Sequence, residues 1–501
     1  MGIPETSNSP ASEPSQTLAA SPMNQGWNPF SHVLLRFAFT YWLLYSLPVI
    51  LAFPVVLASL GVKQLGPREW ATTPPRWVMR MTEWISAPSG WVDSANNWLT
   101  PKVSQNLLHV STESPTDPSG SGDRLFAYAT AFTDLVLAIA ITLIWSIASL
   151  LWRRWRGVGR QNYDRLNAWM RLIVRFHLMD MMIVYGAIKI WCGQFPPIGD
   201  FQLDAKYGDS SPMGLLWRFM QYSQPYTSAT GIIEFTCGVL LISRRTTLLG
   251  AMLAAGATLQ VFLLNMCYDV PVKLMSGHLF LMALTLIVAD APRLARFFVL
   301  GRPVEPRPET PLFGRWRRVE RTAAILLTLS FSAFAAIHLL DAYRDAKSEG
   351  MLADENPVLG RWVGKEFIRD GVAVPFPEQP VNPPPQQFTP GSYKGGPGMP
   401  AVVRAGIGHY FVALLFEDGY GISYRNVSQE RSLLVLLQSK DASPAGRLAV
   451  TFPEPDLLVL EGPLDGQNVK MTLRKVPPSP KKDYLLKNRE FKWVQEYPFN
   501  R

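Results

Sequence analysis

The chain has 501 residues, enough for two or three domains, and contains three cysteines without a C-x-x-C spacing. This cysteine pattern excludes a Cys-rich metal site and argues against a disulfide framework or a thiol-exchange site. The formal net charge of +9 is compatible with nucleic-acid binding. However, the basic residues lie beside apolar runs, where orientation in a lipid bilayer explains them. We therefore expect a lipid bilayer, and no nucleic acid, as a partner.

Residues 1–32 are rich in Ser, Pro and Ala and contain no Lys, no Arg and no apolar run. This composition predicts a disordered N-terminal tail. Because a charged n-region is missing, the tail is not expected to be a signal peptide, and the first apolar segment would act as an uncleaved signal anchor.

Seven apolar segments predict transmembrane helices, because about 20 apolar residues of helix cross the ~30 Å core of a bilayer. They lie at about Val33–Leu60, Phe126–Trp152, Leu172–Trp191, Thr227–Ser243, Thr247–Cys267, Val272–Ala289 and Thr322–Leu340. Residues 33–345 are thus expected to form an all-α membrane bundle. The fourth and sixth segments are short, so the main alternative is five or six spans, with one segment re-entrant or on the surface.

The connection 61–125 carries a regular series of tryptophans. Four of them recur every seven residues: Trp77, Trp84, Trp91 and Trp98. On a helix this spacing makes one aromatic stripe, and Trp favours the membrane–water interface. We expect an external helix lying at that interface, with a lid over a site between the helices as the alternative. The stretch Ser119–Asp123 is predicted to be a flexible lead into the second segment.

Arginines are concentrated in the connections that follow the second, fourth and sixth segments. They are Arg153, Arg154, Arg156, Arg160, Arg165 and Arg171; Arg244 and Arg245; and Arg293, Arg296, Arg302, Arg307, Arg315, Arg317, Arg318 and Arg321. These connections share one side only if all seven segments span, and the positive-inside rule then places them in the cytoplasm. The pattern predicts a multi-pass protein of the cytoplasmic (inner) membrane with a cytoplasmic N-terminus and a periplasmic or extracellular C-terminal domain.

Residues 346–501 predict a soluble all-β domain that follows a short polar helix at 341–358. Asp-Gly pairs, which favour hairpin turns because both positions tolerate positive φ, occur at 370–371, 418–419 and 465–466. Strand-like runs begin near Gly360 and continue at Tyr410–Phe416, Leu433–Gln438, Arg447–Phe452, Leu457–Glu461 and Val469–Val476. We expect an antiparallel meander, either a small barrel or a sandwich. Pro375–Pro400 would be a surface excursion, and 491–498 a last segment packed on the sheet.

The sequence contains no P-loop, no G-x-G-x-x-G before a helix, no H-E-x-x-H and no G-x-S-x-G. Its six histidines have no metal-like spacing, so neither a metal site nor a haem is expected. Catalytic residues cannot be named, and the absences weigh against an enzyme while leaving that class open. His177, His278 and His338 lie in or near apolar helices, where a single histidine is usually a hydrogen-bonded structural residue.

Ionisable residues inside membrane helices are the candidate ligand-binding residues, because each costs about 2.5 kcal/mol or more unless it is paired. They are Arg175, Asp180, Lys189, Glu234, Asp269, Lys273 and His278. Asp269 and Lys273 are close enough in the chain to pair across a turn. The set predicts either salt bridges that fix the bundle or a polar pocket near the outer face that binds a head group or moves a proton.

The middle of the chain, 171–290, resembles the four-helix unit of the DoxX-like family of membrane proteins. The resemblance rests on an arginine (Arg171 or Arg175) followed by Gly186-Ala187-Ile188-Lys189, and on a second helix with Gly231, Glu234, Gly238 and Arg244-Arg245. Tyr268-Asp269-Val270-Pro271-Val272-Lys273 with His278, and the ending Glu496-Tyr497-Pro498-Phe499-Asn500-Arg501, resemble a larger subgroup with flanking helices and a C-terminal β domain. The four-helix unit covers under a quarter of the chain.

The resemblance implies an accessory or binding subunit, because some relatives in that family serve membrane systems that pass electrons to quinone or maintain thiol redox balance. A lipid or quinone-like ligand would lie in the polar pocket, a membrane redox protein would be the partner, and no other cofactor is expected. The first alternative is a membrane anchor that displays the β domain to a partner. The second is an enzyme at the membrane surface.

Overall fold

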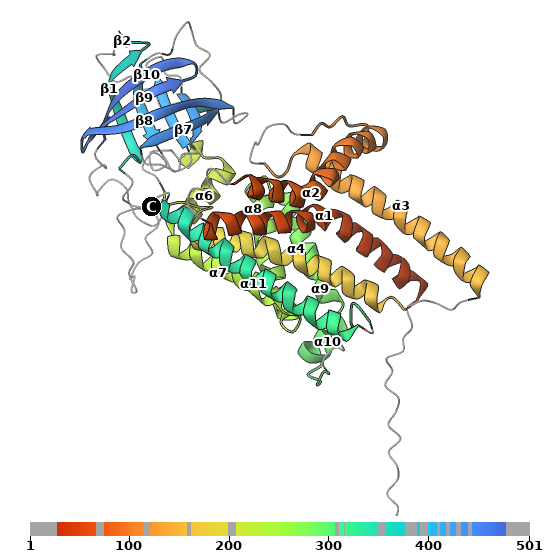
Figure 1. Cartoon of the computed structure of the whole chain (residues 1–501). Coiled ribbons are helices and arrows are strands. Elements are labelled where there is room, and N and C mark those ends of the chain that lie inside the picture. Colours follow the sequence, from red (N-terminus) through yellow and green to blue (C-terminus); the bar gives the residue numbers. More distant parts are fainter. Residues whose placement is uncertain are drawn as a thin grey trace, which may run out of the picture.

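The computed structural model is a bundle of long helices followed by a β-barrel (Figure 1). It describes residues 28–66, 75–114, 121–157, 162–198, 207–305, 310–314, 316–348, 357–375, 388–390, 399, 401–407, 411–416, 421–426, 432–438 and 443–476. The helices that matter here are α1 (Pro29–Leu65), α2 (Arg76–Val103), α3 (Leu125–Arg156), α4 (Asp164–Ile190), α6 (Pro212–Tyr222), α7 (Gln224–Ile242), α8 (Thr247–Cys267), α9 (Lys273–Val288), α10 (Ala291–Leu294), η4 (Ala295–Val299) and α11 (Arg317–Ser348).

Each of the seven predicted apolar segments is a helix, namely α1, α3, α4, α7, α8, α9 and α11. Within the described residues, five of them (α1, α3, α7, α8 and α11) are long and apolar enough to cross a membrane. A sixth span results if α9 is joined to α10 and η4, which bend away from it by 68°. The short fourth segment, α7, therefore meets the criterion of length and composition, whereas α4 does not.

Helix α4 lies at the centre of the bundle and contacts α1, α7, α9 and α11. Its apolar side chains, including Leu178, Met179 and Ile183, are buried together with several charged ones. Charged residues lower its hydropathy, yet Arg175, Asp180 and Lys189 are buried among the neighbouring helices. The helices of the predicted 171–290 unit pack as a group, because α4 contacts α7 and α9, and α8 contacts both of these.

Glycines bring α4 and α7 into backbone contact. A Cβ atom built on Gly186 would lie 2.4 Å from the amide nitrogen of Phe235, and one built on Gly231 would lie 2.6 Å from that of Ile190. Small residues allow the backbones of packed helices to approach this closely. The Gly186 and Gly231 positions therefore set the distance between these two helices.

Ion pairs show which helix ends lie together. Arg244 reaches Glu320 at 3.1 Å, joining the turn between α7 and α8 to the start of α11. At the opposite end, Lys63 near the end of α1 reaches Asp341 of α11 at 2.8 Å. We call the end of the bundle near Arg244 and Glu320 the basic end, because it contains the described parts of the three arginine-rich connections. We call the opposite end the barrel end, because the barrel, α2 and α6 lie there (Figure 1). The described residues of all three predicted basic connections thus lie at one end of the bundle.

Eight strands close into a barrel, because β1 pairs with both β4 and β10. The strands are β1 (Gly360–Arg369), β2 (Val372–Val374), β3 (Phe388–Pro390), β4 (Val402–Ile407), β5 (Phe411–Phe416), β6 (Gly421–Asn426), β7 (Leu433–Gln438), β8 (Pro444–Glu454), β9 (Leu457–Leu464) and β10 (Gln467–Lys475). β2 and β3 lie outside the ring, and β3 pairs with β6 in parallel. Alternate side chains fill the interior with Trp362, Phe416 and Leu460 among others. The barrel alternative of the sequence analysis is the one observed.

Two predicted Asp-Gly hairpin turns are confirmed. Asp370 and Gly371 connect β1 to β2 with φ of 48° and 81°, and Asp465 and Gly466 connect β9 to β10 with φ of 47° and 80°. Both positions of each pair adopt the left-handed backbone that this turn requires. The third pair, 418–419, and the predicted last segment, 491–498, lie outside the described residues.

Three predicted boundaries need correction. Helix α1 begins at Pro29, inside the region predicted to be a disordered tail, because Asn28 caps it by accepting a hydrogen bond from the amide of Ser31 at 2.7 Å. Helix α11 continues without a break to Ser348, so no separate polar helix begins at 341. The lead into α3 is anchored rather than loose, since the amide of Gly122 donates to the carbonyl of Pro271 at 2.8 Å.

Gly231→Ala should destabilise the bundle, because the new methyl group would meet the backbone of α4. Overpacking of this kind costs about 1–3 kcal/mol. Gly256→Ala in α8 is the matched control, since a Cβ there has no neighbour within 4 Å. Thermal unfolding in a mild detergent should show a lower midpoint for the first variant only. Equal midpoints would refute the proposed role of the contact.

Candidate functional site

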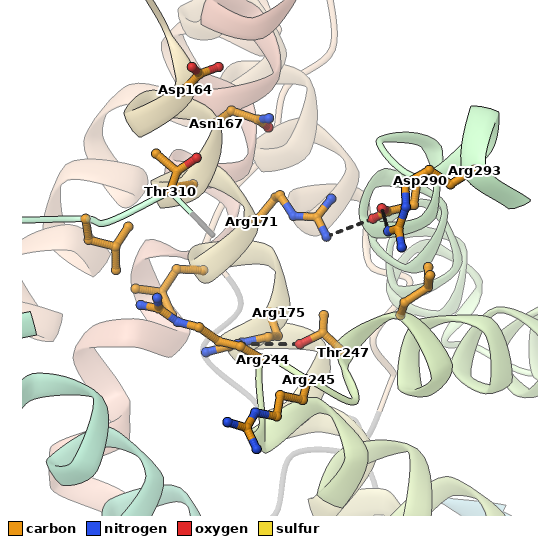
Figure 2. A pocket seen from close by; sticks show the side chains of 14 residues that line it. Asp164, Asn167, Arg171, Arg175, Arg244, Arg245, Thr247, Asp290, Arg293 and Thr310 are labelled. Atoms are coloured by element: carbon orange, nitrogen blue, oxygen red, sulfur yellow. Dashed lines mark hydrogen bonds and ion pairs between the residues drawn. The ribbon is translucent and has the colours of Figure 1, made fainter. Parts of the chain in front are cut away.

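A cavity of 430 Å³ lies at the basic end of the bundle, and arginine side chains dominate its lining (Figure 2). The lining residues are Asp164, Asn167, Ala168, Arg171, Leu172 and Arg175 of α4; Arg244, Arg245, Thr247 and Leu248 around the α7–α8 turn; Asp290 and Arg293 around the α9–α10 turn; and Thr310 and Leu312. We call this cavity the basic pocket. All three arginine-rich connections contribute to it, which is possible because their helix ends lie together.

Local structure places the arginines around the cavity. Arg171 and Arg175 are separated by four residues of α4 and therefore lie on the same face of that helix. Arg244 and Arg245 belong to the tight turn between two antiparallel helices. Arg293 lies on α10, where the chain has turned away from α9. The guanidinium groups thus come from three separate elements.

Asp290 holds two of these arginines in place. Its buried carboxylate accepts from Nη2 of Arg171 at 3.4 Å and from Nη1 of Arg293 at 2.6 Å (Figure 2). Arg171 also donates to the carbonyl oxygen of Leu286 at 3.2 Å, and Arg293 to that of Glu305 at 3.2 Å. One carboxylate therefore orients guanidinium groups from α4 and α10 before any ligand is bound.

The remaining polar contacts leave the lining rich in positive charge. Nη1 of Arg175 donates to the hydroxyl of Thr247 at 3.4 Å, and Arg244 pairs with Glu320, which lies outside the lining. The lining itself carries five arginines and two aspartates. Planar guanidinium groups bind carboxylates and phosphates through paired hydrogen bonds. This chemistry suits an oxyanion.

Sequence reasoning identified only part of the basic pocket. Arg175 was a candidate, and Arg171, Arg244 and Arg245 entered through the family resemblance. Arg293 was interpreted only as a signal of membrane orientation, and Asp290 was missed. The sequence did predict that the three arginine-rich connections lie on the same side of the membrane. Arginines that flank packed helices on one side come near one another, and this prediction could have pointed to the pocket.

Lys189 and Glu234, two other candidates, form a buried ion pair between α4 and α7. Nζ lies 2.5 Å from Oε1, and the side chains are only 9% and 6% exposed. The pair lies beside the Gly186 and Gly231 contact and towards the barrel end. Since each charge is compensated by the other, the pair acts as a cross-link between the helices.

Asp269 and Lys273 pair across their turn at 2.8 Å, as the sequence predicted. Asp123 also lies near Lys273, at 3.7 Å. Its carboxylate accepts from the backbone amides of Lys273 and Leu274 at 2.8 and 3.0 Å and so caps the first turn of α9. This cluster fixes the start of α9 to the chain before α3, and sequence reasoning missed Asp123.

His278 and His177 lie in an aromatic cluster in the middle of the bundle. The hydroxyl of Tyr41 donates to Nε2 of His278 at 2.7 Å, because Nδ1 donates to the carbonyl of Leu274 at 2.7 Å. Tyr45 stacks on His278 with ring centroids 4.2 Å apart, and Nδ1 of His177 lies 3.0 Å from the hydroxyl of Ser46. Asp180 is buried one turn after His177 on α4.

The seven candidate residues therefore do not form one site. They lie in the basic pocket (Arg175), the aromatic cluster and its neighbourhood (His278, Asp180), the α4–α7 cross-link (Lys189, Glu234) and the start of α9 (Asp269, Lys273). Within the described part of the chain, no group of three or more His, Cys, Asp or Glu side chains is arranged to hold a metal ion.

Comparisons with known proteins give one informative match. The uncharacterized protein YwoB of Bacillus subtilis (strain 168) is 30% identical over 133 residues, which are 26% of this chain and 84% of YwoB. No family model matches the chain, and no solved structure matches it. The resemblance to the DoxX-like family therefore stays a prediction.

Breaking the cross-link should be more harmful than removing it. Glu234→Leu leaves the charge of Lys189 buried without compensation, which costs about 3–5 kcal/mol. The double variant Lys189→Met/Glu234→Leu removes both charges and should recover most of the lost stability. Unfolding in denaturant measures both. If the double variant is no more stable than the single one, the pair is not the cross-link described here.

Proposed function

We propose that this chain, which belongs to the same family as the uncharacterized protein YwoB, is an integral membrane binding protein that holds a phosphate-type oxyanion in its basic pocket. The observation that carries the proposal is the convergence of five arginines from three connections on one cavity. Guanidinium groups held close together repel one another, and a bound anion would relieve that repulsion.

Residence in a membrane is supported by the apolar outer surfaces of the long helices. On α3, a series of large apolar side chains is exposed: Ile139, Leu143, Ile144, Ile147, Leu150 and Leu151. Soluble proteins rarely expose continuous apolar faces of this size. The positive-inside rule places the basic end in the cytoplasm and the barrel on the other side of a cytoplasmic membrane. In this arrangement α4 is a seventh span shielded by its neighbours.

A quinone-like ligand is less well supported than an anion. The polar residues that would bind a neutral quinone are engaged in pairs: Lys189 with Glu234 at 2.5 Å and Lys273 with Asp269 at 2.8 Å. A neutral ligand in the basic pocket would bring no negative charge to the guanidinium groups. An oxyanion instead gains hydrogen bonds to charged donors, each of which contributes about 1.5–3 kcal/mol.

A second candidate function, display of the barrel to a partner protein, is favoured by the network at the barrel end. Lys63 pairs with Asp341 and Asp345 at 2.8 and 3.1 Å, and Nε2 of Gln64 donates to Asp341 at 2.5 Å. Arg344 donates to the carbonyl of Gln64 at 3.2 Å. The last turns of α11 are thereby fixed to α1 just before the barrel begins, which suits a display role.

Arg175→Gln should weaken binding of phosphate-bearing probes by about tenfold, the loss of one charged hydrogen bond. Binding of pyrophosphate and of dioctanoyl phosphatidic acid to the full chain in mild detergent measures this, with uncharged dioctanoylglycerol as the comparison. Arg302→Gln, at an exposed position outside the pocket, is the matched control. The proposed function fails if neither phosphate-bearing probe binds, or if both variants bind as the wild type does.

The orientation can be tested with single cysteines. In a Cys267→Ser background, Arg302→Cys should react with a membrane-impermeant maleimide only after the cells are opened, whereas Thr451→Cys on β8 should react in intact cells. Cys192 and Cys237 are buried and should stay unlabelled. Labelling of both introduced cysteines from the same side would overturn the proposed topology.

A further inference from the structure

Resting on the proposed function, we infer that the occupant of the basic pocket is an anionic phospholipid of the adjacent leaflet, whose phosphate contacts the arginines while its acyl chains stay in the bilayer. The shared chemistry is that of a phosphate group, which a soluble phosphate compound would also offer. Three features of the basic end favour the lipid.

The first feature is an apolar segment beside the pocket. After α9 ends at Val288, the chain bends by 68° into α10 and η4. This segment exposes four consecutive large apolar residues: Phe297 at 55%, Phe298 at 66%, Val299 at 78% and Leu300 at 57%. Arg293 and Arg296 lie on the same short segment. Exposed apolar residues with neighbouring arginines are typical of segments that lie in the plane of the lipid headgroups.

The second feature is that this segment builds part of the pocket. Arg293 of α10 and Asp290 immediately before it are both lining residues. Phe297 follows Arg293 by about one helical turn, so the apolar residues directly adjoin the wall of the pocket. If Phe297 and Phe298 enter the headgroup region, the guanidinium groups are at the level of the lipid phosphates.

The third feature is the apolar and aromatic surroundings of the remaining lining. Trp169 packs edge-on against Phe313 with centroids 5.8 Å apart, and both are partly exposed, next to the lining residues Ala168 and Leu312. Leu249 is exposed beside Leu248 of the lining. Tryptophan favours the membrane interface. These side chains mark a lipid-facing border around a charged cavity.

The charge of the pocket also selects among lipids. A headgroup that ends in a choline or ethanolamine would bring its cation towards five arginines. A headgroup that exposes its phosphate avoids this repulsion. The pocket is therefore expected to favour phosphatidic-acid-like lipids over zwitterionic ones.

The test compares probes that share a phosphate but differ in acyl chains. Dioctanoyl phosphatidic acid should bind the full chain in mild detergent at least about tenfold more tightly than glycerol phosphate, and more tightly than dioctanoyl phosphatidylcholine. Phe297→Ser/Phe298→Ser should reduce that advantage without changing the affinity for glycerol phosphate. Ile144→Ser/Ile147→Ser, which alters exposed apolar residues of α3 outside the pocket lining, is the matched control and should leave the advantage intact.

The outcomes separate the two proposals. Equal affinity for glycerol phosphate and dioctanoyl phosphatidic acid would overturn the lipid inference and leave a soluble phosphate ligand, so the proposed function would stand. Equal affinity for phosphatidylcholine and phosphatidic acid would overturn the selection by charge. If no phosphate-bearing probe binds, the proposed function itself fails, and the lipid inference fails with it.

Discussion

Helix α4 carries Arg171, Arg175, His177, Asp180 and Lys189 along its length, and burying these groups governs how the rest of the bundle is arranged. A helix with this many ionisable side chains is costly in contact with lipid unless its neighbours compensate them. Here α1, α7, α9 and α11 surround it, and polar partners come from α1, α7, α8 and the turn after α9. Glu234 on α7 pairs with Lys189, and Asp290 after α9 pairs with Arg171.

The two halves of α4 differ in how their charged side chains are compensated. Towards the barrel end, the Lys189–Glu234 pair and the glycine contact close α4 against α7. Towards the basic end, the turns between the other helices approach α4 with more arginines than carboxylates. The excess of positive charge is tolerated there because that end borders the headgroup region in the proposed orientation. The proposed ligand site thus lies where the arginines of the lining outnumber its carboxylates.

Apolar composition and turn chemistry were sufficient to predict the seven apolar helices and two of the hairpins of the barrel domain. In lipid, the backbone N–H and C=O groups of a run such as Thr247–Cys267 are all hydrogen-bonded within the run only if it forms a helix. Asp370-Gly371 and Asp465-Gly466 are informative because few other residue pairs accept two positive φ values. These signals are local, so they can be recognised without knowledge of the tertiary structure.

The candidate site was harder to predict, because its residues come together only through the packing of distant segments. Asp123 caps a helix that begins 150 residues later in the chain, and no local pattern indicates this. Arg175 and Lys189 share a face of α4, yet they are roughly 21 Å apart along its axis at 1.5 Å per residue. A single pocket could not contain both side chains at that separation. Depth along the helix is therefore as informative as the face on which a residue lies.

A cryo-EM structure of the full chain in lipid nanodiscs that contain phosphatidic acid would locate the occupant of the basic pocket. We expect phosphate density within hydrogen-bond distance of the Arg175 and Arg293 guanidinium groups. We also expect Phe297 and Phe298 to enter the headgroup layer. A basic pocket that contains only water, in a map that resolves the arginine side chains, would refute the binding of a phospholipid there.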